Sequence, residues 1–144
     1  MTVAKILKSK GSADVVTIAP GSTVAEAAGL LSEKRIGSVV ISADGSDASG
    51  ILSERDIVRE IGRRGAGCLD EPVDTMMTTK LVTCTRADKA DAVLATMTKG
   101  RFRHMPVMEE GKMVGLITLG DVVKYRLEEL AMEKDALEGM IMGF

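Results

Sequence analysis

The feature that most constrains the fold of this chain is a motif that occurs twice. The segment GILSERD at residues 50–56 returns in altered form as GLITLGD at residues 115–121, so Asp56 and Asp121 lie 65 positions apart. Each copy runs from a glycine through apolar, strand-like residues to a hydroxyl residue, with an aspartate three positions later. A repeat of this length exceeds the 20 to 50 residue periods of solenoids, so it indicates two copies of one domain-sized unit.

The residues around the motif predict the same order of elements in both halves. This order is a short leading helix, a strand, a helix, two strands joined by a hairpin turn, and a second helix. In the first half we predict helices at 3–7, 23–34 and from 53, and strands at 15–18, 38–42 and 48–52. Thr23 and Glu26 have the spacing of a capping box, and the glycines at 62, 65 and 67 end the second helix, whose apolar face is Ile57, Val58 and Ile61.

The second half repeats this order at offsets of 65 to 70 residues. We predict a leading helix at 73–77, strands at 81–84, 104–108 and 113–117, a helix capped by Asp88 with Asp91, and a last helix from Gly120 to about Glu138. The boundaries are therefore set at residues 1–66 for the first repeat, 67–130 for the second, and 131–144 for a helical extension with an apolar tail.

Each unit of about 60 residues is too small to be comfortably stable alone. We therefore predict an α+β fold in which the two sheets pack on one another about a pseudo-two-fold axis. Two related clefts would open between the copies.

Composition and charge exclude several classes of function. The chain has 19 basic and 21 acidic residues, so it lacks the positive electrostatic field that attracts nucleic acids. It has only three aromatic residues on which bases could stack. Its first residues do not have the pattern of a signal peptide, and no run approaches a membrane span, so we expect a cytoplasmic protein without membrane insertion. No nucleophile has a placed base, so we expect no enzyme. Cys84 is expected to be buried at a strand position, whereas Cys68 lies in a Gly-rich connector, where it could be exposed.

The repeated motif has two chemical interpretations. Ser53 and Thr118 each stand where a strand ends and a helix begins, so the first N–H groups of the helix could point free and attract phosphate. Asp56 and Asp121 could then accept the two hydrogens of a ribose diol. The alternative is a capping box, in which the same atoms satisfy the helix itself, and the sequence leaves it open.

The order of elements, the segments GILSERDIVR and VGLITLGDVVK, and the segment RFRHMPV closely resemble the tandem cystathionine β-synthase (CBS) domain pair, or Bateman module, over about residues 1–130. The resemblance implies a stand-alone, non-catalytic sensor that binds adenosine-containing ligands such as AMP, ATP, NAD(H) or S-adenosylmethionine as regulatory ligands. It assigns ribose to Asp56 and Asp121 and phosphate to Ser53 and Thr118.

The resemblance also implies which residues surround the rest of the ligand. The implied adenine pocket is lined by residues around the first strands and before the second strands: Thr17, Ile36, Gly37 and Ser38 in the first copy, and Thr83, Arg103, His104, Met105 and Pro106 in the second. Candidate phosphate contacts are the basic residues Arg55, Arg59, Arg103, His104 and Lys124. For His104, a hydrogen bond to backbone is the open alternative, and no metal role is expected because no second histidine exists.

The two copies are unequal. Gly120 stands where the first copy has Arg55, while Arg103 and His104 stand where it has Gly37 and Ser38. We therefore expect the clefts to differ in ligand or charge preference.

The extended last helix and its apolar tail favour burial against a second copy of the chain, hence a homodimer, over burial within one chain. A regulated enzyme or transporter is a possible target. The rival hypothesis is a dimerisation or docking module whose clefts are vestigial.

Overall fold

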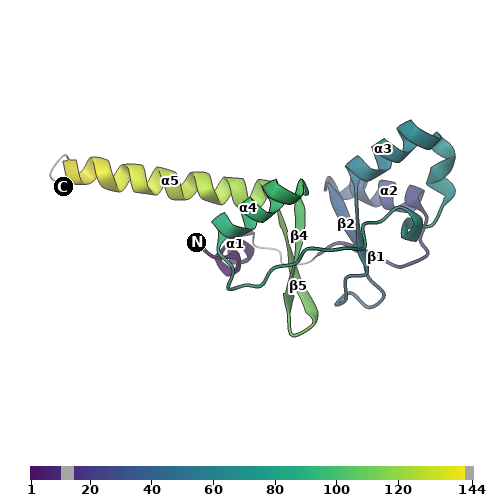
Figure 1. The fold of residues 1–144 in the computed structure, drawn as a ribbon, viewed down its shortest axis with the longest axis horizontal. Coiled ribbons are helices and arrows are strands. Elements are labelled where there is room, and N and C mark those ends of the chain that lie inside the picture. The colour runs from purple at the N-terminus through teal and green to yellow at the C-terminus, as the bar shows by residue number, and fades with distance from the viewer. Residues whose placement is uncertain (11–14, 142–144) are drawn as a thin grey trace.

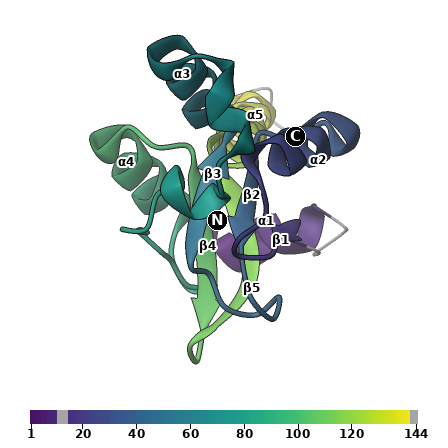
Figure 2. The ribbon, with the colours of Figure 1, turned by 90° about the vertical axis from the view of Figure 1, so that its right-hand side faces the viewer.

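The computed structural model describes residues 1–10 and 15–141. Gly11 and Ser12, whose residue types favour a turn after the leading helix, and the tail residues Met142 and Phe144 lie outside the described residues. The chain folds as predicted into an α+β structure of two similar halves, in which the sheets meet in the middle and helices cover their outer sides (Figure 1). Viewed along the long axis, strands of both halves run through the centre with the helices around them (Figure 2).

The first half contains a three-stranded sheet with two helices against it. Strand β1 (Thr17–Ile18) pairs parallel with β2 (Ser38–Ile41), which pairs antiparallel with β3 (Gly50–Ser53). Helix α2 (Val24–Lys34) begins with the predicted capping box, and α3 (Glu54–Arg64) ends at Gly65. Its core is formed by the buried faces of these elements, including Leu31, Leu52 and Ile57.

The second half contains a two-stranded sheet. Strand β4 (His104–Glu109) pairs antiparallel with β5 (Lys112–Thr118), and the turn between them has positive φ at Glu110 and Gly111, as a two-residue type I′ hairpin requires. Helices α4 (Ala90–Gly100) and α5 (Leu119–Ile141) pack on this sheet, and α5 continues three residues past the predicted end at Glu138. A separate small cluster around Val40, Ile51 and Met113 contains residues of both sheets and joins the halves.

The leading segment of each half packs into the core of the other half. Val3 of α1 (Val3–Ser9) is buried among second-half residues, and Val73 of the 3₁₀ turn η2 (Val73–Thr75) among first-half residues. Backbone hydrogen bonds hold both segments, from the Val3 N–H to the Asp88 carbonyl (2.8 Å) and from the Val73 N–H to the Ser22 carbonyl (2.7 Å). The boundary predicted between residues 66 and 67 separates the two repeats in the sequence. The two cores do not follow this boundary, because each contains the leading segment of the other repeat.

The glycines that open the two motif copies permit these close approaches. A Cβ at Gly50 would lie 2.6 Å from Met77 Sδ, and one at Gly115 would lie 2.7 Å from Leu7 Cδ2. Both distances are shorter than any real Cβ contact. The glycine of the motif therefore serves packing between the halves.

The strand predicted at 81–84 is reduced to a single parallel bridge from Cys84 to β4. In the first half, the N–H of Val40 donates to the Val16 carbonyl at 3.1 Å. Pro106 stands at the equivalent position in the second half and has no N–H to donate. The second half thereby loses a hydrogen bond that holds its first strand in the sheet.

The predicted cap of α4 is wrong. The N-cap residue is Lys89, which lies 66 positions after Thr23, and no side chain caps the helix. Asp88 stands one residue too early, and its carboxylate accepts a hydrogen bond from the Thr85 N–H at 2.8 Å instead. Asp91 therefore has no capping partner there.

Three smaller predictions also differ from the structure. Val58 is 69% exposed, because only the neighbouring face of α3 is turned toward the core. Cys68 is buried, because the connector forms a 3₁₀ helix, η1 (Ala66–Asp70), that packs against α2 and α3. The predicted helix at 73–77 is the shorter turn η2.

Candidate functional site

Strand register brings each motif hydroxyl residue opposite the first residue of the preceding strand. Ser53 pairs with Ser38, and Thr118 pairs with His104. The CBS resemblance assigns Ser53 and Thr118 to the phosphate, and Ser38 and His104 to the adenine pocket. The register therefore places a phosphate residue and an adenine residue together at one end of each sheet.

Both motif copies form a capping box. Ser53 Oγ accepts a hydrogen bond from the Asp56 N–H (3.2 Å), and Asp56 Oδ2 accepts one from the Ser53 N–H (3.0 Å). Thr118 and Asp121 form the same pair at 3.1 and 3.0 Å. The first N–H of α3 and of α5 also donates to a carbonyl of the loop before β2 or β4. The expectation of free N–H groups is therefore wrong for the first and third N–H groups of each helix, because that loop and the cap supply their acceptors.

Each capping carboxylate also contacts a cation, from a different source in each copy. Lys10 Nζ donates to Asp121 Oδ2 (2.8 Å) and to the Leu116 carbonyl (2.9 Å), whereas Arg59 donates to Asp56 Oδ1 (2.7 Å) from the same helix. Burial acts to raise the pKa of Asp121, but hydrogen bonds from Lys10 and Thr118 outweigh it and lower the pKa. Asp121 is therefore a carboxylate at neutral pH.

A cavity of about 260 Å³ lies between the two halves, beside the second motif copy. Its walls come from α1 and the segments before β1 and β2 on one side, and from β4 and β5 on the other. The lining residues are Leu7, Lys10, Val15, Val16, Ile36, Gly37, Ser38, His104, Leu116 and Thr118.

One lining residue carries an unsatisfied polar atom. Ser38 is 5% exposed, and its Oγ has no hydrogen-bond partner within residues 1–10 and 15–141. Ser42 follows β2 and is equally buried, but its Oγ donates to Asp47 and accepts from the Gly45 N–H. Because a buried unpaired hydroxyl costs about 1–3 kcal/mol, the cavity wall holds a hydrogen-bonding group that a bound molecule could satisfy.

His104 lies between the two motif copies. A Cβ built on Gly37 would lie 3.5 Å from His104 Nε2, so the ring reaches from the second half to the first. Burial lowers the pKa of His104, and the nearby carboxylates of Asp56, Glu54 and Asp121 oppose this only in part. The ring is therefore neutral at pH 7 and can both donate and accept a hydrogen bond.

The structure separates the other predicted site residues from this cavity. Thr17 lies in β1 beside Val40, and Thr83 is exposed in the segment that forms no strand. Met105 is buried in the core of the second half, and the Pro106 carbonyl accepts the Cys84 N–H. The remaining ones lie at the first motif copy or on the surface: Ser53, Arg55, Asp56, Arg59, Arg103 and Lys124.

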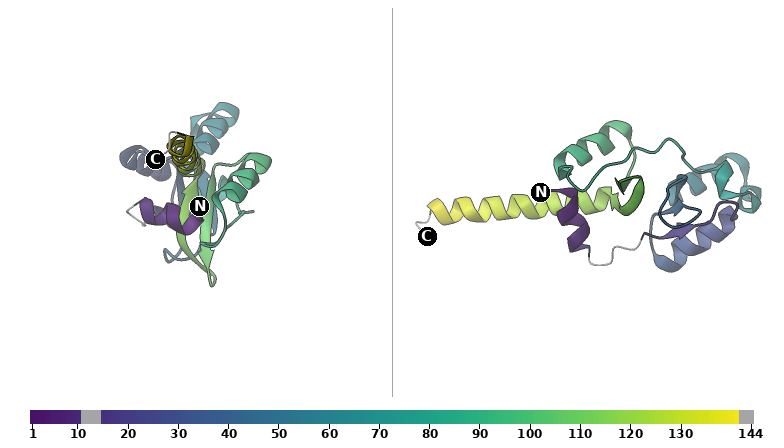
Figure 3. Two further views of the ribbon diagram at one scale, coloured as in Figure 1. Left: turned by 90° about the vertical axis from the view of Figure 1, so that its left-hand side faces the viewer. Right: turned by 90° about the horizontal axis from the view of Figure 1, so that it is seen from below.

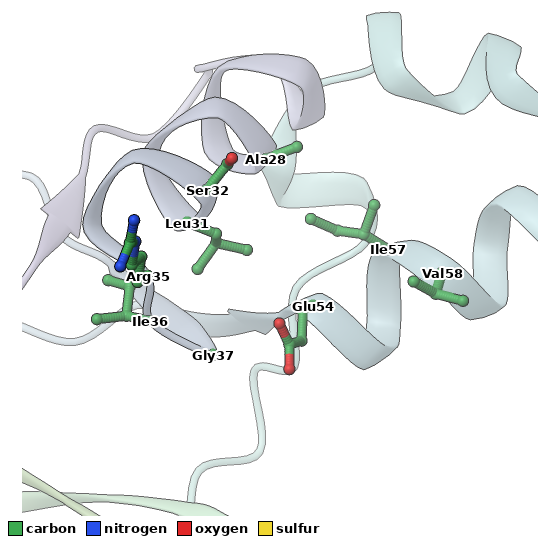
Figure 4. Close-up of a pocket in the computed structure, with 9 residues that line it drawn as sticks. All are labelled: Ala28, Leu31, Ser32, Arg35, Ile36, Gly37, Glu54, Ile57 and Val58. Carbon is green, nitrogen blue, oxygen red and sulfur yellow. The ribbon is translucent and has the colours of Figure 1, made fainter.

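A second hollow, of about 550 Å³, lies between α2 and α3 (Figure 4). Leu31 and Ile57 face one another across it, with Arg35 and Glu54 toward one end. It contains neither motif hydroxyl nor motif aspartate.

The repeat itself contained a signal for the residue that the sequence interpretation missed. Lys10 follows the first leading segment as Lys80 follows the second. The same offset of 70 residues that makes Leu7 equivalent to Met77 also makes the two lysines equivalent. Their position after the leading helix was visible in the sequence. The contact of Lys10 with Asp121 was not, because it depends on α1 packing against the opposite half.

Within the described part of the chain, no helix is long and apolar enough to cross a membrane. The same residues contain no group of three potential metal ligands.

Comparisons with known proteins agree with this geometry. The family model described as CBS domain matches residues 4–63 and 73–128. A mitochondrial CBS domain-containing protein of Arabidopsis thaliana is 32% identical over 149 residues, which cover 99% of this chain and 72% of that protein.

Solved structures show the same similarity. A CBS-domain containing protein from Agrobacterium tumefaciens has a TM-score of 0.83 and 41% identity, covering 88% of this chain and 99% of that one. A CBS domain protein from Pyrobaculum aerophilum, complexed with AMP, has a TM-score of 0.77 and 25% identity, covering 92% of this chain and 99% of that one.

Proposed function

Because this chain belongs to the CBS domain family, we propose that it is a regulatory module that binds an adenosine-containing ligand between its two repeats. The AMP complex of the similar Pyrobaculum protein supports this ligand class. The module senses the ligand and catalyses no reaction of it.

The observation that carries the proposal is the unpaired Ser38 hydroxyl in the wall of the cavity between the repeats. A protein that retains a buried unsatisfied group loses stability, so such a group is expected where a ligand supplies the partner. Ser38 belongs to the segment that the CBS resemblance assigns to adenine, and His104 and Thr118 line the same cavity. An adenine has both donors and acceptors for these side chains.

The charges of this cleft favour a ligand with a phosphate. Lys10 is held by Asp121, and a ribose diol that bound Asp121 would release the lysine toward the phosphate. The volume of about 260 Å³ is below the usual range for ligand pockets, which favours a mononucleotide over a dinucleotide. We therefore propose AMP as the best-fitting ligand, with ATP and NAD(H) as weaker alternatives.

We further propose that the module works in the cytoplasm, where such nucleotides are regulatory metabolites, and that it works as a homodimer. Binding would act on a target enzyme or transporter by favouring one arrangement of the repeats. A ligand shifts such an equilibrium only as far as its affinities for the two arrangements differ.

A thermal-shift panel of AMP, ADP, ATP, NAD, NADH and S-adenosylmethionine tests the proposal. A ligand at 100 times its dissociation constant adds about 2.7 kcal/mol to the free energy of unfolding. We expect the largest rise in melting temperature with AMP. If no ligand of the panel changes the melting temperature, the proposal is refuted and the rival function as a docking module with vestigial clefts is favoured.

Variants Asp56→Asn and Asp121→Asn distinguish the two clefts. Asparagine keeps a side-chain oxygen for the helix cap but removes the charge that favours a diol. Each ligand-induced shift is compared with the melting temperature of the same variant without ligand, which separates binding from the loss of cap stability. We expect Asp121→Asn to reduce the shift with AMP.

A further inference from the structure

The exposed face of α5 has the spacing of a coiled-coil seam. Successive positions along it are separated by four, three, four, three and four residues, which is the alternation of d and a positions in a heptad repeat. These positions are Val123, Leu127, Leu130, Lys134, Leu137 and Ile141. Five of the six are apolar.

This seam is not used by the chain itself. Leu127 is 62% exposed, Leu137 60% and Ile141 83%. The helix packs on its own repeat through a different face, where Val122 and Tyr125 are buried. Beyond these contacts α5 projects from the body of the molecule (Figures 1 and 3).

From this pattern we infer that α5 forms an antiparallel two-stranded coiled coil with α5 of a second copy of this chain. The pairing centres on residue 132, so that Leu127 lies against Leu137 of the second chain and Leu130 lies against Lys134 of the second chain. This interface is separate from the nucleotide cleft and does not depend on the proposed ligand.

The charges beside the seam select the antiparallel direction. In that direction Lys124 lies beside Glu138 of the second chain, and the pair occurs twice by symmetry. A parallel coil would instead place Lys134 against its own copy within the seam and Glu133 against Glu138 of the second chain. Both contacts are between like charges.

One like-charge contact remains in the antiparallel arrangement. Glu133 meets its own copy at the symmetry axis, and Lys134 is adjacent to it on both chains. Lys134 is also an alternative partner for Glu138 within the chain, at 3.9 Å. Such exposed pairs contribute little, so the cross-chain contacts can replace this one.

The seam spans about three heptads, which is near the lower limit for a coiled coil. We therefore expect a reversible dimer that dissociates on dilution. Sedimentation velocity of the full chain over a range of concentrations measures this directly.

Leu130→Glu and Met132→Glu form a matched pair of variants. Both place a glutamate at an exposed apolar position of α5, but Leu130 is in the seam and Met132 is on the opposite side. We expect Leu130→Glu to weaken self-association at least tenfold and Met132→Glu to leave it unchanged. Equal self-association of both variants, or a wild-type chain that is monomeric at every concentration, would overturn the inference.

Cysteine cross-linking determines the direction. The chains Leu127→Cys and Leu137→Cys are oxidised separately and as an equimolar mixture, with wild type as the control for the buried Cys68 and Cys84. An antiparallel coil gives a disulfide-linked dimer only in the mixture. Cross-linking of each variant alone would refute the antiparallel direction and indicate a parallel coil.

Discussion

Replacing Ser38 by alanine should have opposite effects on the free protein and on its complex. In the free protein the Ser38 Oγ is buried without a partner, at a desolvation cost of about 1–3 kcal/mol. Removing the hydroxyl recovers this cost, less the packing contacts of the oxygen itself. We therefore expect Ser38→Ala to raise the free energy of unfolding by about 1 kcal/mol, or the melting temperature by about 3 °C.

In the complex, the same change removes a hydrogen bond to the ligand. A hydrogen bond contributes about 0.5–1.5 kcal/mol, so the dissociation constant for AMP should rise about 2- to 10-fold. Chemical denaturation of the free protein and isothermal titration calorimetry with AMP measure the two effects separately.

Ser42→Ala is the matched control. Ser42 is as buried as Ser38 and follows the other end of the same strand, but its hydroxyl makes two hydrogen bonds. We expect Ser42→Ala to destabilise the free protein and to leave the affinity for AMP unchanged. If Ser38→Ala instead destabilised the free protein and bound AMP as tightly as wild type, the role we assign to this hydroxyl would be wrong.

Three further predictions concern the cation, the histidine and the glycines. Lys10→Met should bind uncharged adenosine more tightly than wild type does, because no ammonium group competes for the Asp121 carboxylate. The variant should bind AMP less tightly, because the lysine no longer contacts the phosphate. In calorimetry, the preference for AMP over adenosine should therefore fall about tenfold. Burial holds the pKa of His104 below its ordinary value of 6.5, so below that pH the unfolded chain takes up a proton that the folded chain does not. Stability to urea should therefore fall from pH 7 toward the lower folded-state pKa, and His104→Gln should reduce this fall. Gly50→Ala should lower the free energy of unfolding, measured by denaturation, by about 1–3 kcal/mol. The loss should be greater than for Gly115→Ala. The new Cβ at residue 50 would also lie 3.0 Å from the backbone carbonyl oxygen of Thr78, whereas a Cβ at residue 115 would meet only the flexible side chain of Leu7.

Opposite results would identify which step is wrong. Unchanged selectivity in Lys10→Met would mean that the lysine does not reach a phosphate. An equal pH dependence of wild type and His104→Gln would assign the proton uptake to another group. A milder effect at Gly50 than at Gly115 would mean that the leading segment of the first repeat is the more tightly packed one.

The sequence predicted the repeated unit because its signals are local. The hydroxyl and aspartate spacing and the Thr23 capping box depend on neighbouring residues, and both form the local contacts that such spacing predicts. The offsets of 65 and 66 residues also match the register of the two sheets, since Ser53 pairs with Ser38 and the equivalent Thr118 pairs with His104.

The predictions failed where two halves or two functions meet at one residue. Pro106 looked like a pocket residue, but its missing N–H weakens a strand that propensity alone predicted. The first and third N–H groups of α3 and α5 were not free, and capping uses the same hydroxyl and carboxylate that a nucleotide would use. Lys10 was missed because its partner lies 111 residues away.

The unequal copies lead to a last prediction, which concerns stoichiometry. The cavity beside Asp121 has the small residues Gly37 and Ser38 in its wall. At the first motif copy, Arg103 and His104 occupy the positions equivalent to Gly37 and Ser38. His104 also lines the cavity beside the second motif copy. Larger side chains leave less room for an adenine, so we expect one AMP per chain in calorimetry. Replacing His104 by serine should enlarge the space at both copies and raise the stoichiometry toward two, whereas a wild-type value of two would show that the volume of these residues does not decide occupancy.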